Sequence, residues 1–345
     1  MDRISQVDRS DNGNLFLMEN EKLRVFLTDI GASIFAVQWK LPDGGVEDIA
    51  LTCDTLADFS KNRAYLGATV GRTVNQIKNA VFTLNGKSYH LSQNSGKHNS
   101  HGGKSGFSHR RWGTELTNDQ VHFLLHSYDG DEGYPGNLDA TVTYRLDNDK
   151  IEITYRAISD KDTPFGFTNH TYWCLGGLGK NIYPQRLQVN GSFYLEVDDE
   201  LVPTGQILSV KDSVKDFTET KLLGDCLQPL PFSIQRTKGY DVSYIRDSRE
   251  FGCAATLYDT ESGRKLEVFT NMPIIHLYTG NYLRDEVGKE GRRYQCHDAL
   301  CLEASYYPDA INNVHFGRAV LRAYQLQEDK ICFKITQESV KNHCL

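Results

Sequence analysis

Two side chains have the types and the surroundings of an acid–base pair. Glu303 follows the apolar run 299–302, and His170 lies between the aromatic residues of 165–167 and those of 172–173. A carboxylate at the end of a buried strand is costly unless it is hydrogen-bonded or used in a reaction. A Glu and a His in one cleft can act as base and acid near neutral pH. The two residues therefore predict a proton-transfer pair, and a satisfied polar residue at a strand end is the alternative interpretation of each.

Polar side chains that could hold a substrate are concentrated in a few short segments beside glycines and aromatic residues. Their Asn, Asp and His side chains can hydrogen-bond to hydroxyl groups, and their rings can pack on the apolar face of a sugar. Together they favour a sugar-handling enzyme in which distant parts of the chain meet. The segments are 71–77, 99–103, 168–173, 239–244 and 301–309.

The elements that must position these residues read as strands. Residues 23–39 are rich in Val, Ile, Phe and Leu, are interrupted by Gly31 and run into a turn at 42–45. Helical periodicity is weak, and its best window, around 208–218, is short and polar. Many short strands without alternating helices predict an all-β sandwich or barrel, and the lack of a linker predicts one domain over residues 1–345. Further expected strands are the hairpins 141–146/151–158 and 255–258/265–270, together with 192–197 and 331–335.

Composition narrows the class of partner. The 345 residues include 38 basic and 45 acidic side chains, a formal charge of −7, and no cluster of Lys and Arg. This balance argues against nucleic acid or an anionic membrane and favours a neutral small molecule. Residues 1–6 lack the apolar stretch of a signal peptide, and the eight cysteines form no Cys-x-x-Cys pair. We therefore expect free thiols and a cytoplasmic protein.

Several familiar motifs do not qualify. The Gly-Lys-Ser sequences at 86–88 and 103–105 lack the earlier glycine of a phosphate loop, and there is no Gly-x-Ser-x-Gly elbow. His98, His101 and His109 match no standard zinc spacing. Separate hydrogen-bonding roles in loops are the better interpretation of these three histidines.

The same residues, with others in order along the chain, resemble the aldose 1-epimerase family, also called the galactose mutarotase family. Residues after 313 match only loosely. The resemblance implies a large antiparallel β-sandwich, the galactose mutarotase-like supersandwich. It also implies an enzyme that interconverts the α and β anomers of free hexoses such as galactose and glucose. It implies no cofactor or metal, a monosaccharide as the small-molecule partner, and a monomer or homodimer. The similar segments are 67–75, 82–91, 101–112, 129–138, 168–170, 239–241, 278–281 and 302–312.

The resemblance also implies roles for individual residues. Glu303 matches the general base, which takes the proton of the C1 hydroxyl, and His170 matches the general acid, which protonates the ring oxygen. The chain departs from the family pattern at other positions: Gln76 replaces an Arg, His276 a Gln, Val242 a His and Ser100 a Leu. Arg72 matches a different Arg, for which we expect a structural role. The expected substrate-binding residues are Asn75, Gln76, His101, Asp241 and His276.

Two alternatives stay open beside the hexose mutarotase. The first is a mutarotase for another sugar, such as a phosphosugar or a disaccharide, although Gln76 in place of a guanidinium counts against a phosphate. The second is a sugar-binding or regulatory domain without catalysis. Retention of both Glu303 and His170 argues against it, because binding alone needs neither a base nor an acid. For the enzyme, we expect activity to fall at low pH as the base becomes protonated.

Overall fold

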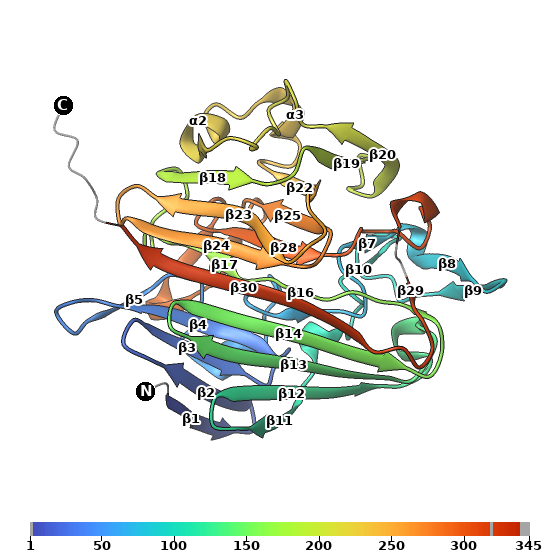
Figure 1. Cartoon of the computed structure of the whole chain (residues 1–345), viewed down its shortest axis with the longest axis horizontal. Coiled ribbons are helices and arrows are strands. Elements are labelled where there is room, and N and C mark those ends of the chain that lie inside the picture. The colour runs from blue at the N-terminus through green and yellow to red at the C-terminus, as the bar shows by residue number, and fades with distance from the viewer. Residues whose placement is uncertain (1–2, 318–319, 339–345) are drawn as a thin grey trace.

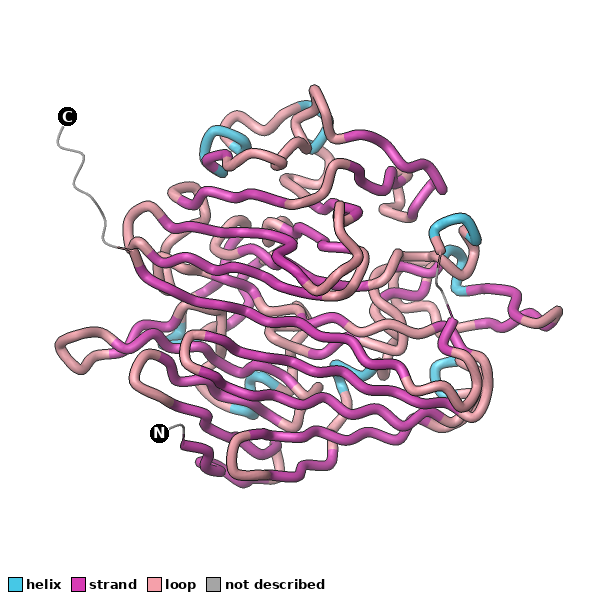
Figure 2. The backbone as a smooth tube through the Cα atoms, viewed as in Figure 1, coloured by secondary structure: helices cyan, strands magenta, loops and turns pink. Residues whose placement is uncertain are grey.

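The computed structural model describes residues 3–317 and 320–338, and most of its strands belong to three antiparallel sheets (Figure 1, Figure 2). A five-stranded sheet joins β1 to β5 in chain order, over Arg3–Ser10, Gly13–Glu19, Leu23–Thr28, Ser33–Lys40 and Val46–Asp48. A nine-stranded sheet has the order β11 (Gly113–Leu116), β12 (Gln120–Ser127), β13 (Leu138–Asp147), β14 (Lys150–Ser159), β30 (Gln327–Gln337), β24 (Arg264–Thr270), β23 (Gly252–Asp259), β18 (Gln185–Val189) and β21 (Lys221–Leu222). A six-stranded sheet has the order β17 (Tyr172–Trp173), β28 (Leu300–Ser305), β25 (Ile274–Tyr278), β22 (Asp241–Ile245), β19 (Phe193–Val197) and β20 (Pro203–Ser209).

Short ribbons and helices connect the large sheets. The α-helices of the described residues are single turns: α1 (Leu56–Phe59), α2 (Leu223–Leu227) and α3 (Phe232–Gln235). None of the helices in this part of the chain is long and apolar enough to cross a membrane. The two-stranded ribbons pair β6 (Thr69–Val70) with β16 (Thr168–Asn169), β7 (Gln76–Ile77) with β10 (Asn99–Ser100), β8 (Val81–Leu84) with β9 (Lys87–His90), β15 (Thr163–Pro164) with β29 (Val320–Leu321), and β26 (Arg284–Val287) with β27 (Arg293–Gln295).

The main hydrophobic core lies between the nine-stranded sheet and the other two, which confirms the predicted all-β sandwich. In β13 every second side chain is buried, the pattern of an antiparallel strand with one face on a core and one in solvent. Val142 of this strand belongs to the same buried cluster as Leu27 of the five-stranded sheet and Leu277 of the six-stranded sheet. Burying such a side chain stabilises the fold by roughly 1.5–3 kcal/mol.

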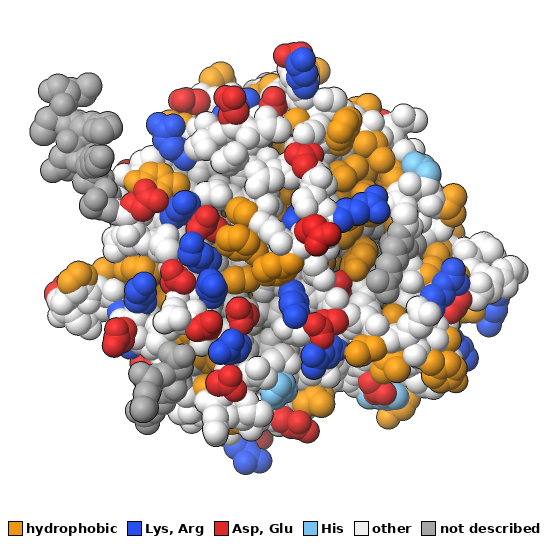
Figure 3. All heavy atoms as spheres, in the orientation of Figure 1, with side chains coloured by type: hydrophobic (Ala, Val, Ile, Leu, Met, Phe, Trp, Pro, Cys, Tyr) orange, Lys and Arg blue, Asp and Glu red, His pale blue; other side chains and the backbone are white. Residues whose placement is uncertain are grey.

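The solvent face of the nine-stranded sheet carries acidic and basic side chains in alternation (Figure 3). Arg156 of β14 pairs with Glu328 of β30 at 2.7 Å, and Lys334 of β30 pairs with Glu267 of β24 at 3.1 Å. Because the charges are mixed, this face offers no basic patch of the kind that binds a polyanion.

The predicted strands and their breaks are confirmed. Residues 141–146 and 151–158 lie in β13 and β14, which pair antiparallel up to Asp147 opposite Lys150. The predicted strand 23–39 is divided into β3 and β4 at Gly31, whose φ is 67° and where a Cβ would lie 2.5 Å from the carbonyl oxygen of Ser108. The weakly helical window 208–218 is the end of β20 followed by turns.

Two strands of the six-stranded sheet are buried along their whole length. β25 and β28 have no exposed residue, because one face of each packs on the main core and Tyr278 and Cys301 of the other face belong to a second buried hydrophobic cluster. Leu277, Leu302 and Ala304 face the core. Since successive side chains of a strand point to opposite faces, the residues between them face away from the core, where the polar side chains of the sequence motifs come together.

Candidate active site

Three neighbouring strands place polar side chains in two adjacent rows on the outer face of the six-stranded sheet. In the first row Glu303 of β28 is paired with His276 of β25, which is paired with Ser243 of β22. In the second row, two residues away along each strand, Cys301, Tyr278 and Asp241 are paired in the same order. Antiparallel register therefore unites residues that are up to 62 positions apart in the sequence (303 − 241).

A cavity of about 330 Å³ lies over these rows. Its walls combine hydrogen-bonding side chains with the rings of Tyr65, Tyr172 and Tyr278. A mixture of apolar walls and a few convergent polar groups is typical of a site for a small molecule. All seven residues that the sequence predicted for the site line this cavity: Asn75, Gln76, His101, His170, Asp241, His276 and Glu303.

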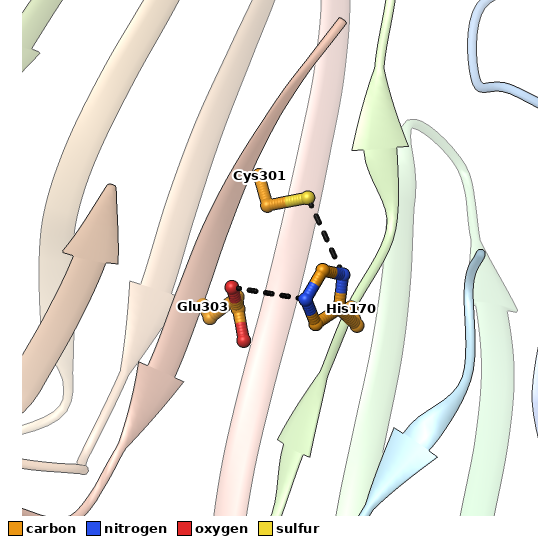
Figure 4. Close-up of side chains that lie close together, drawn as sticks. All are labelled: His170, Cys301 and Glu303. Carbon is orange, nitrogen blue, oxygen red and sulfur yellow. Dashed lines mark hydrogen bonds and ion pairs between the residues drawn. The ribbon is translucent and has the colours of Figure 1, made fainter. Parts of the chain in front are cut away.

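His170 and Glu303 face each other at the floor of the cavity (Figure 4). Nε2 of His170 lies 3.5 Å from Oε1 of Glu303, and both side chains are almost fully buried. The backbone of His170, between β16 and β17, is held on both sides: its N–H donates to Ala68 O, and its carbonyl accepts from Gly67 N. The second ring nitrogen, Nδ1, lies 3.5 Å from Sγ of Cys301.

Burial reverses the usual order of the proton affinities of the two groups. It raises the pKa of Glu303 from 4.5 to about 7; the charge of His276 opposes this rise and that of Asp241 adds to it. Burial also lowers the pKa of His170 well below 6.5, and His101 beside it acts in the same direction. The single proton that the pair holds near neutral pH therefore favours Glu303, and the form with an ionised carboxylate and a protonated imidazole is the minor arrangement of that proton.

His276 contacts Asp241 and is the cross-strand neighbour of Glu303. Its Nε2 lies 3.1 Å from Oδ1 of Asp241, and its Nδ1 lies 2.8 Å from Oγ of Ser243. Burial disfavours the imidazolium, but the hydrogen bond and charge of Asp241 outweigh burial, so the pKa of His276 is raised above 6.5. Asp241 thus favours the protonated form of His276 next to the base.

The opposite wall presents buried polar atoms that have no partner within the described chain. They come from the β7–β10 ribbon and its flanks, where Ser100 pairs with Gln76. Burial lowers the pKa of His101 to about 4, so this imidazole is neutral at neutral pH and its two nitrogens are one donor and one acceptor. Unpaired buried polar groups are unfavourable, and the hydroxyl groups of a ligand would satisfy them. The atoms of this wall are Asn75 Nδ2, Gln76 Oε1 and His101 Nδ1, and Oε2 of Glu303 on β28 is likewise buried without a partner.

Sequence reasoning missed part of the aromatic lining. The ring of Tyr65 lies 4.8 Å from that of His101 and 5.9 Å from that of His170, between centroids, and so closes one side of the cavity. Tyr65 stands alone in a loop segment without a strand pattern, so no local signal marks it. Ser243 was also missed as a site residue, because its role depends on the pairing of β22 with β25.

Other predicted polar residues have structural roles. Arg72 lies outside the cavity lining and donates to the carbonyls of Ser127, Tyr128 and Pro135. His98 accepts a hydrogen bond from the Asn79 backbone through Nδ1, and His109 packs on Tyr65. These contacts agree with the structural role expected for Arg72 and with the hydrogen-bonding role expected for His98, whereas the contact found for His109 is with an aromatic ring.

One cluster brings three possible metal ligands together within the described residues. His170, Cys301 and Glu303 each offer an atom within 4.8 Å of the others. The thiol contacts Nδ1 and the carboxylate contacts Nε2 (Figure 4). Both ring nitrogens of His170 therefore have a neighbour within this cluster.

Comparison with known proteins agrees with this architecture. The sequence pattern of the aldose 1-epimerase family matches residues 14–331. The chain is 36% identical to the galactose mutarotase of Bos taurus over 324 residues, which cover 93% of each chain. It is also 36% identical to the aldose 1-epimerase of Escherichia coli K12 over 304 residues, 87% of each chain.

Solved structures give the same result for the fold. A GalM/aldose epimerase homologue from C. elegans superposes with a TM-score of 0.87 at 29% identity, covering 94% of this chain and 99% of that one. A galactose 1-epimerase from Lactobacillus acidophilus superposes with a TM-score of 0.84 at 28% identity, covering 98% and 99%. The fold and site are those of a sugar epimerase. The chain belongs to the aldose 1-epimerase family.

Proposed function

We propose that Glu303 and His170 carry out the interconversion of α and β hexose anomers, the isomerase activity of this family. The observation that carries this proposal is their placement: a buried carboxylate and a buried imidazole face each other across 3.5 Å in a cavity lined by unpaired polar atoms. A sugar bound there has hydroxyl groups for these atoms, and the tyrosine rings offer it an apolar surface.

Ring opening needs one proton removed and one supplied. The Glu303 carboxylate takes the proton of the C1 hydroxyl, and the electron pair left on that oxygen forms the carbonyl as the bond from C1 to the ring oxygen breaks. The Nε2 proton of protonated His170 goes to the ring oxygen. The pair thereby changes from carboxylate and imidazolium to carboxylic acid and neutral imidazole.

Ring closure reverses these transfers after rotation about C1–C2. Glu303 returns its proton to the carbonyl oxygen, Nε2 of His170 recovers the proton of the C5 hydroxyl, and attack on the other face of C1 gives the second anomer. The pair holds one proton throughout the cycle, so the enzyme returns to its starting state without another reactant.

The remaining predicted residues select the substrate. Asn75, Gln76 and His101 line one wall, and the Asp241–His276 pair lines another, so hydroxyl groups on both sides of a hexose find partners. Galactose and glucose are the substrates we propose. Gln76 and His276 stand where the family resemblance leads us to expect an Arg and a Gln. We propose that these two positions set any difference in sugar preference between this enzyme and its relatives.

The state of the cysteines bears on the cellular setting. The seven cysteines of the described residues are free thiols, as a reducing compartment favours, and Cys344 lies outside those residues. A cytoplasmic enzyme that acts as a monomer or homodimer on a free sugar, without nucleic acid as a partner, accords with this chemistry.

Polarimetry on freshly dissolved α-galactose and α-glucose tests the proposal directly. The purified chain is expected to accelerate the approach of the optical rotation to its equilibrium value. Isothermal titration calorimetry with the same sugars separates the alternatives. Binding without acceleration of either sugar identifies a non-catalytic sugar-binding protein, and the absence of both binding and acceleration identifies a site for a different sugar.

A further inference from the structure

The imidazole of His170 has a second partner that the proton-transfer scheme does not use. Cys301 lies two residues before Glu303 on β28, so its side chain points to the same face of the strand. Its Sγ is 3.5 Å from Nδ1 of His170, the ring nitrogen that Glu303 does not face (Figure 4). Cys301 is fully buried and is absent from the cavity lining, so it meets the sugar only through the histidine.

We propose that Cys301 is a positioning residue for the acid: its sulfur accepts a hydrogen bond from Nδ1–H of His170 and keeps Nε2 directed at the ring oxygen of the sugar. This inference rests on the proposed function of His170. It adds a residue that contacts neither the substrate nor the reacting atoms.

The reaction itself selects this direction of the hydrogen bond. Nε2 must give its proton to the ring oxygen and later take it back, so between these two steps the imidazole is neutral and Nε2 carries no hydrogen. The remaining proton is then on Nδ1. The partner of Nδ1 must accept, and sulfur is a weak acceptor that can do so. A histidine whose second nitrogen is held in this way keeps the tautomer and orientation that the transfer requires.

The neutrality of the thiol also fits the role. Burial raises the pKa of Cys301 well above 9, and the charge of Glu303 acts in the same direction, so the group stays a thiol. A carboxylate at this position would stabilise the imidazolium and make His170 a weaker acid. The thiol orients the ring without adding charge, and His170 remains ready to give up its proton.

Packing around the ring leaves it little freedom to turn. The Tyr172 ring lies 5.0 Å from the imidazole, and the rings of His101 and Tyr65 lie at 5.7 Å and 5.9 Å. These contacts restrain the plane of the imidazole, but a ring flipped by 180° fills nearly the same space. The sulfur contact distinguishes the two orientations.

A matched pair of cysteine variants tests the inference. Cys301→Ala removes the acceptor, whereas Cys301→Ser replaces it by a hydroxyl that can still accept. Cys174→Ala is the control, because Cys174 is a free thiol equally buried in the same hydrophobic cluster and outside the cavity lining. Polarimetry gives kcat and KM for each, and thermal melting shows that each variant is folded.

We expect kcat of Cys301→Ala to fall about 10-fold with little change in KM, a loss typical of a partner that orients a functional histidine. Cys301→Ser should recover most of that loss, and Cys174→Ala should match the wild type. Equal kcat values for Cys301→Ala and Cys174→Ala would overturn the inference, as would a loss confined to KM. A wild type without activity would instead contradict the proposed function.

The tautomer provides a second measurement that does not need turnover. In protein with ¹⁵N-labelled histidine, the His170 signals are assigned by their loss in His170→Gln. We expect neutral His170 to carry its hydrogen on Nδ1 in the wild type, and Cys301→Ala to shift part of the population to the Nε2–H form. A wild-type His170 with its hydrogen on Nε2 would overturn the inference even if the alanine variant failed to fold.

Discussion

Nε2 of His276 lies 3.1 Å from Oδ1 of Asp241, and the same imidazole is the cross-strand neighbour of Glu303. One histidine thus holds a substrate-facing carboxylate and, when protonated, places a positive charge beside the proposed base. Asp241 supports that charge by raising the pKa of His276, against the opposing effect of burial.

Replacing His276 by Gln should make Glu303 a stronger base that titrates at higher pH. The positive charge of His276 lowers the pKa of Glu303 and the negative charge of Asp241 raises it, so loss of the cation leaves only the second effect. We expect the alkaline limb of the kcat/KM profile to move to higher pH in His276→Gln. His126→Gln is the control, because His126 pairs with Asp139 on the exposed face of β12. An alkaline limb at the same pH as in the wild type would show that His276 does not affect the pKa of Glu303.

The pH dependence of the wild type follows from the one-proton pair. Burial raises the pKa of Glu303 to about 7 and lowers that of His170 below 6.5, so the pair holds a single proton between these two values. Above about pH 7 that proton is lost, and well below pH 6.5 a second proton arrives. We expect kcat/KM to fall on both sides. A rate that keeps rising above pH 7 would mean that neutral His170 acts beside the ionised carboxylate.

Gln76 tests how the site recognises sugar. Its Oε1 is buried and unpaired in the cavity wall, so Gln76→Ala should remove one hydrogen bond to the substrate. We expect KM for galactose to rise about 3- to 10-fold with kcat nearly unchanged, as the loss of one hydrogen bond predicts. Gln188→Ala is the control. Gln188 lies on β18 and donates to the carbonyl of Thr218, so its loss should leave KM unchanged. A fall in kcat alone would assign Gln76 to the chemical step.

Arg72 tests the division between structural and functional residues. Its guanidinium is buried and donates to three backbone carbonyls, so Arg72→Ala leaves buried acceptors unpaired. We expect the free energy of unfolding to fall by about 3 kcal/mol in urea titrations. The folded fraction should keep the wild-type KM. An increase in KM without loss of stability would place Arg72 in the substrate site.

The sequence predicts the strands better than their assembly. Alternating side chains define β13 and β14, and Gly31 marks the break between β3 and β4, because these signals are local. The pairing of His276 with Glu303 is not local, since register between distant strands depends on the whole sheet.

The same distinction holds for the site. Glu303 and His170 are conspicuous because each is a polar residue in an apolar setting, and the family resemblance assigns the other candidates. Tyr65 has no such signal, and Cys301 reads as one more apolar residue of a buried strand. Its contact with His170 depends on a fold that brings residues 131 positions apart together.

Glu303 is the proposed base, and polarimetry of Glu303→Gln on α-galactose is the decisive test of this role. The amide keeps the size of the side chain and cannot take the C1 proton. We expect the enzymatic rate to fall by about 10²–10⁴-fold, while galactose still raises the melting temperature of the variant. A variant that folds, binds galactose and equilibrates the anomers at the wild-type rate would contradict the account.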